Sequence, residues 1–143
     1  MKNISNLESL DTRTLKYILK NALLDKQEKT QNDFLTFVKA VWPDFVEGKH
    51  HRIYAEKLNR IANGELKRLI VNMPPRHTKS EFASHLFPAF FMGRHPKAKL
   101  IQTTHTGELA IRFGRKAKNM IESSEYERVF PDVRLAADSK AAG

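Results

Sequence analysis

The chain has no cysteine among its 143 residues, which excludes disulfide bonds, thiolate metal sites and cysteine-dependent catalysis. No apolar run approaches the roughly 18 residues that a membrane-spanning helix needs. The first residues lack the apolar core of a secretory signal peptide. Internal repeats and low-complexity segments are missing as well. These absences make a soluble protein of the cytoplasm the default expectation.

Positive charge is what the chain has in excess, because 25 Lys and Arg residues against 16 Asp and Glu residues give a net charge of +9. The basic side chains are spread along the whole sequence. Such an excess favours phosphate-rich partners, although surplus lysine also serves solubility. The hydrophobic share of 41% and the length fit one globular domain with a substantial core. Charge alone leaves nucleic-acid binding an open alternative.

Residues 11–64 are predicted to form a helical lead-in, preceded by a loosely ordered segment over residues 1–10. A first helix starts at Asp11, its predicted N-cap, and its apolar residues repeat at helical spacing. A polar break over residues 26–29 ends this periodicity. Two shorter amphipathic helices follow, and Gly64 is placed to end the last of them.

The second half of the chain alternates between predicted strands and helices. Leu69–Val71 is a continuous apolar run, which favours a strand buried on both faces. Residues 99–104 form a second predicted strand, and residues 133–135 are a candidate third. The helix from Ser80 should kink or end early at Pro88. Such alternation is typical of an α/β fold with a parallel sheet and right-handed crossovers.

The junction between the first predicted strand and its helix is laid out like a phosphate-binding loop. It reads PPRHTKS over residues 74–80. Lys79 and Ser80 match the last two positions of the usual pattern, whereas Met73 and Thr78 stand in place of its two glycines. Because a β-branched residue resists positive φ, the loop either keeps φ negative at Thr78 or carries strain of about 1–3 kcal/mol.

The side chains of this loop have predicted roles in binding ATP and Mg²⁺. Lys79 would place its ammonium between the β- and γ-phosphates, and the Ser80 hydroxyl would coordinate Mg²⁺. Arg76 adds a second cation, and the N–H donors come from residues 76–80 because proline has none. The plainer interpretation, a proline turn followed by a capped helix, stays open. The candidate cofactor-binding residues are Arg76, His77, Thr78, Lys79, Ser80 and Glu81, with Lys79 also the candidate catalytic residue.

The string KRLIVNMPPRHTKSEFAS over residues 67–84 resembles the start of the ATPase domain of tailed-phage terminase large subunits. The similarity extends over about residues 33–143. It implies a P-loop NTPase-type parallel sheet, of which residues 65–143 would be a truncated first part. It also implies ATP and Mg²⁺ as cofactors. The implied partners are double-stranded DNA, a small terminase subunit and a portal protein, with the full-length protein forming a homo-oligomeric ring in the host cytoplasm and not remaining in the virion.

The chain departs from the terminase pattern where hydrolysis would be carried out. An acidic Walker B pair should end a later apolar strand, but neither Asp132 nor Asp138 follows such a strand. The nuclease domain of the family is also missing. We therefore expect phosphate binding with almost no turnover. Two alternatives remain: another P-loop ATPase of helicase or recombinase type, and a non-catalytic basic segment that binds nucleic acid through charge alone.

Several other polar residues fit structural roles better than functional ones. His50 and His51 are adjacent on a predicted helix, so they point to different faces and lack a third metal ligand. Tyr54 fits core packing better than stacking on a base. Either Thr104 or Thr106 is expected to cap the following helix. The basic stretch over residues 112–118 fits a solvated face better than a DNA-binding surface.

Overall fold

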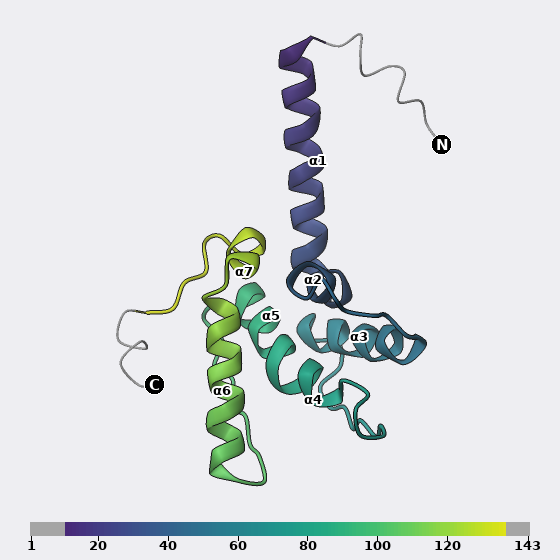
Figure 1. Cartoon of the computed structure of the whole chain (residues 1–143), viewed down its shortest axis with the longest axis vertical. Helices are drawn as coiled ribbons and strands as arrows, with labels where there is room; N and C mark the ends of the chain where they lie inside the picture. Colours follow the sequence, from purple (N-terminus) through teal and green to yellow (C-terminus); the bar gives the residue numbers. More distant parts are fainter. Residues whose placement is uncertain (1–10, 137–143) are drawn as a thin grey trace.

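The computed structural model describes residues 11–136, and over this range it consists of helices joined by turns and irregular segments (Figure 1). Residues 1–10, for which we predict loose order, and residues 137–143, which include Asp138, lie outside the described range. The helices are α1 (Thr12–Asn32), α2 (Phe34–Val41), α3 (Lys49–Ala62), α4 (Lys79–Glu81), the π-helical turn η2 (Phe82–Leu86), α5 (Phe87–Arg94), α6 (Gly107–Ile121) and α7 (Ser124–Val129).

The predicted α/β fold with a parallel sheet is wrong, because residues 11–136 contain no strand. All three segments predicted as strands are irregular, and no backbone hydrogen bond joins them to one another within the described residues. The predicted burial of Leu69–Val71 on both faces is also wrong, since Ile70 is 87% exposed, and Ile101 in the second segment is 89% exposed. The neighbours of Ile70 on either side pack against the helical core instead. A strand persists only when a neighbour pairs its backbone groups, and these segments have helices beside them.

Pro88 shows how one of these segments attaches to a helix. Proline has no N–H, so the carbonyl of Ser84 lacks the donor that an α-helix would supply four residues later. The side-chain amide of Gln102 donates to this carbonyl at 3.3 Å. The helix winds more widely through η2 just before Pro88 and then continues as α5 to Arg94. The proline therefore changes the winding of the helix without ending it.

Helix α1 begins as predicted but runs further. The Asp11 carboxylate accepts a hydrogen bond from the backbone of the first turn at 2.6 Å, which confirms the N-cap. The predicted polar break is wrong, because the helix continues to Asn32. Gln27 and Gln31 in this stretch donate their side-chain N–H groups to the carbonyl of Val129 at 3.2 and 2.6 Å. The last turns of α1 are thus held by the end of α7, whereas its first turns extend away from the other helices (Figure 1).

The core is aromatic and lies between α2, α3 and the continuous helix formed by α4, η2 and α5. Phe82 is fully buried, with ring centroids 5.2 Å from Phe34 in an edge contact and 5.7 Å from Tyr54 in a stacked one. Tyr126 of α7, a helix that the sequence analysis does not predict, is also fully buried. Its hydroxyl donates to the carbonyl of Ala89 at 3.0 Å, and burial raises the pKa of Tyr126.

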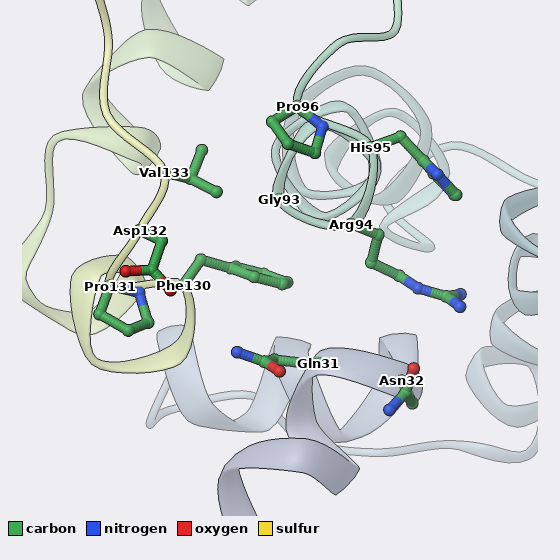
Figure 2. A pocket seen from close by; sticks show the side chains of 10 residues that line it. All are labelled: Gln31, Asn32, Gly93, Arg94, His95, Pro96, Phe130, Pro131, Asp132 and Val133. Atoms are coloured by element: carbon green, nitrogen blue, oxygen red, sulfur yellow. The ribbon is translucent and has the colours of Figure 1, made fainter.

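Gly93 lets the segment after α7 pack closely on the end of α5. Figure 2 shows the ring of Phe130 directed toward the helix end that carries Gly93. A Cβ atom added at Gly93 would lie 2.6 Å from atoms of this ring, which is too close for any real contact. Gly114 in α6 differs, because an added Cβ would meet nothing within 4 Å.

These two glycines give a matched test of the fold. Gly93→Ala should lower the free energy of unfolding by about 1–2 kcal/mol, because overpacking against Phe130 outweighs the gain in helix propensity. Gly114→Ala should raise it by up to about 1 kcal/mol, since only the propensity changes. Urea unfolding of both variants measures the difference. Equal changes in both variants would contradict the packing of Phe130 on α5.

Candidate phosphate-binding loop

The loop over residues 74–80 follows the irregular segment after α3 and leads directly into α4. Two of its residues have left-handed backbone conformations, Arg76 with φ of 64° and Thr78 with φ of 58°. They are the only non-glycine residues with positive φ in the described range 11–136, and His77 lies between them. Alternation of negative and positive φ turns successive N–H groups toward one side and forms an anion-binding concavity. Thr78 therefore has the strained positive φ and not the negative φ that was the other alternative.

Hydrogen bonds of the Thr78 side chain hold this strained conformation. A β-branched residue in the left-handed region costs about 1–3 kcal/mol. The Thr78 hydroxyl donates to the carbonyl of His77 at 2.7 Å and lies 2.7 Å from Nε2 of His51. In the same turn, Nδ1 of His77 donates to the carbonyl of Pro75 at 2.9 Å. The loop is thus fixed both by its own turn and by a side chain from α3.

His51 is buried, with 6% of its surface exposed, and its ring lies against Phe45 and Phe82 at centroid distances of 4.8 and 5.4 Å. Its Nδ1 accepts the backbone N–H of Gly48 at 2.8 Å. Because an amide N–H can only donate, the imidazole proton lies on Nε2 and is donated to Thr78. Burial lowers the pKa of His51, and the charge of the neighbouring histidine on α3 adds to this effect.

The contact between His51 and Thr78 was not predicted from the sequence, in which His51 was weighed only as a metal ligand. A signal was present in the sequence. His51 is the third residue of α3, the position at which a glutamate in a capping box reaches back to the N-cap N–H. A histidine there can accept that N–H with one nitrogen and present the other to a distant partner.

Lys79 and Ser80 line a cleft of about 410 Å³ between the start of α4 and the face of α3. Within residues 11–136 no side chain or carbonyl bonds the amine of Lys79, so the amine is available to a ligand. Tyr54 lines the same cleft but is only 6% exposed and stacks on Phe82, which confirms its predicted place in the core. The remaining lining residues are Leu58, Ile61, Leu69, Val71, Ala83 and Ser84.

Glu81, the last of the candidate binding residues, is directed toward α6. Its two carboxylate oxygens accept from Lys116 at 2.5 Å and from Nδ1 of His85 at 2.9 Å. Burial raises the pKa of Glu81, but these hydrogen bonds outweigh it and the net shift is downward. The structure thus groups residues 76–80 in one loop and places Glu81 in a separate contact. On α6, Arg112 and Arg115 are exposed, as expected of a solvated face, whereas Lys116 of the same basic stretch is half-buried and pairs with Glu81.

Two further candidates have structural positions. The Thr106 hydroxyl accepts from the backbone N–H of Leu109 at 3.3 Å, which confirms the predicted cap of α6. His50 stacks close to His51, and its Nε2 is buried without a hydrogen-bond partner. In the part of the chain that the structure describes, no three His, Cys, Asp or Glu side chains are grouped so as to hold a metal ion.

A second cleft, of about 400 Å³, lies between the end of α1, the end of α5 and the segment after α7 (Figure 2). Three of its polar side chains already bond other parts of the chain. Gln31 donates to the carbonyl of Val129, Arg94 donates to the side chain of Asn63 at 2.9 Å, and His95 bonds the carbonyl of Ala62 at 2.9 Å. This cleft is a joint between segments and offers a ligand few free groups.

No protein-family model, curated protein or solved structure matches the chain. None of the helices described over residues 11–136 is long and apolar enough to cross a membrane.

The contact of Glu81 with α6 gives a pH-dependent prediction. Its lowered pKa means that the ionised carboxylate stabilises the fold above the ordinary glutamate range and that this contribution is lost as the pH falls through the lowered value. Glu81→Gln should therefore lower the melting temperature slightly at pH 7, since a half-exposed pair is worth less than about 1 kcal/mol. The difference from wild type should shrink below about pH 4.

Thermal unfolding monitored by circular dichroism from pH 3 to pH 7 measures this difference. Glu28→Gln on the exposed surface of α1 is the control and should show no such pH dependence. A Glu81→Gln variant that melts with the wild type at pH 7 would contradict the contribution of this ion pair.

Proposed function

We propose that this chain binds the polyphosphate of ATP at residues 76–80 and that it is the nucleotide-binding part of a DNA-packaging ATPase of the terminase large-subunit type. The observation that carries the proposal is the pair of left-handed residues, Arg76 and Thr78, because alternation of this kind is the backbone pattern of anion-binding concavities. This geometry is strained for both residue types, and strain of this kind concentrates at ligand-binding sites.

The side chains around the loop support an anionic ligand. Lys79 has an amine without a partner among the described residues and lines a cleft together with Ser80. Arg76, in the same loop, is exposed and supplies a second cation. The net charge of +9 raises the local concentration of a polyphosphate near this surface.

The proposal depends on the loop and its cleft, and it does not require a sheet. It is a proposal of binding, with Mg²⁺ carried by the nucleotide and approached by the Ser80 hydroxyl. Terminase function, with double-stranded DNA, a small terminase subunit and a portal protein as partners in the host cytoplasm, is proposed from the string over residues 67–84 alone.

Titration with Mg²⁺–ATP by calorimetry tests the proposal. Lys79→Ala should weaken binding by about 10- to 100-fold, because a hydrogen bond from a charged group to phosphate is worth about 1.5–3 kcal/mol. Lys97→Ala, which removes the same charge from the exposed turn after α5, should change the affinity by less than about twofold.

The same titration distinguishes binding of ATP at residues 76–80 from the alternative, a basic segment that binds polyanions through charge alone. That interpretation predicts equal losses for the two lysine variants and a steep fall in affinity with salt for any polyanion, DNA included. A wild-type protein that binds duplex DNA but gives no calorimetric response to ATP would overturn the proposed function.

A further inference from the structure

We propose that His51 is a positioning residue for the phosphate loop, which it holds in its binding conformation before any ligand arrives. The inference rests on the proposed function, because it assigns to α3 the pre-organisation of that same site. It starts from a single contact, in which Nε2 of His51 lies 2.7 Å from the hydroxyl of Thr78 across 27 positions of sequence.

The contact is directional, because each group in it has one possible role. The backbone N–H of Gly48 donates to Nδ1 of His51, so Nε2 carries the proton and donates to Thr78. The Thr78 hydroxyl then donates its own proton to the carbonyl of His77. A chain of hydrogen bonds therefore runs from the start of α3 into the loop in one direction.

The ring of His51 cannot easily turn away from this role. It is buried between Phe45 and Phe82, and Phe82 belongs to the helix that begins at the loop. The helix therefore positions both partners of the hydrogen bond. Phe82 packs against the donor ring of His51, and Thr78, which carries the acceptor hydroxyl, directly precedes the helix. This arrangement explains a threonine where a glycine would reach the left-handed conformation without strain, since glycine offers no hydroxyl for His51 to hold.

Protonation of His51 would affect its bond with Gly48 and not its bond with Thr78. A second proton on the ring would occupy Nδ1 and break the bond from Gly48. The other titratable groups around the ring are Glu47, His50 and His77, of which only Glu47 favours the charged imidazole. Burial and the neighbouring histidines lower the pKa of His51, so the neutral ring that accepts the Gly48 N–H is favoured, and Nε2 donates to Thr78 in either protonation state.

Binding of inorganic triphosphate, measured by calorimetry at pH 7.5, tests the inference on five variants of the full chain. Thr78→Ser keeps the hydroxyl and should bind within about twofold of wild type, whereas Thr78→Val keeps the shape without it and should bind about five- to tenfold more weakly. Thr78→Gly reaches the conformation without help and should bind within about twofold of wild type. His51→Ala should lose affinity in the threonine background but show no further loss in the Thr78→Gly background.

This last comparison distinguishes positioning from packing. If His51 mattered only for core packing, His51→Ala would weaken binding equally in both backgrounds, and that result would overturn the inference. The Thr78 variants guard against a failure of His51→Ala to fold, because Thr78 lies in the loop and outside the core. Equal affinities of Thr78→Val and Thr78→Ser would also overturn it.

A measurement without ligand separates this inference from the proposed function. Nitrogen-15 spectra of the free protein should show a proton on Nε2 of His51 and a shift of this signal in Thr78→Val but not in Thr78→Ser. That result together with no triphosphate binding would refute the proposed function while leaving the contact in place. An unchanged His51 signal in Thr78→Val would refute the contact itself.

Discussion

The packing of Phe82 is the constraint on which the rest of the structure depends. Its ring is fully buried and contacts Phe34 of α2, Tyr54 and His51 of α3, and Phe45 between them. Phe82 comes four residues after Thr78, so the loop cannot move independently of this cluster. The packing of the Phe82 side chain in the core therefore helps to fix the conformation of the exposed loop.

Some of the structure could be predicted because the controlling interaction is local. The caps at Asp11 and Thr106 each need only a side-chain oxygen and an N–H three residues later, and both are found. The inward face of α3, including Tyr54, follows from helical spacing. For Thr78 the sequence left two alternatives open, a negative φ or a strained positive φ. The loop pattern has a glycine at this position, whereas a β-branched residue resists positive φ.

The rest depended on partners that sequence spacing does not reveal. The apolar run around Ile70 has the composition of a strand, but a strand exists only when a second segment pairs with it, and the described residues provide none. Because Pro88 has no N–H, the carbonyl of Ser84 lacks its helical donor, and the side chain of Gln102 donates to it instead. The segment predicted as the second strand is therefore hydrogen-bonded to a helix. The position of His51 in α3 indicated that one of its ring nitrogens could reach a distant partner, but that this partner is Thr78 follows only from the fold, which brings α3 against the loop.

The free portion of α1 has a consequence for how the molecule responds to heat. Its final turns are tied to Val129 through two glutamines, but the preceding turns have only their own backbone bonds and the Asp11 cap. A helical stretch of about 12–15 residues is marginal in water when nothing packs against it. Amide protons along α1 should therefore exchange on a gradient, quickly near Thr12 and slowly near Thr30. On heating, α1 should unfold from its N-terminal end toward Thr30 before the aromatic core unfolds.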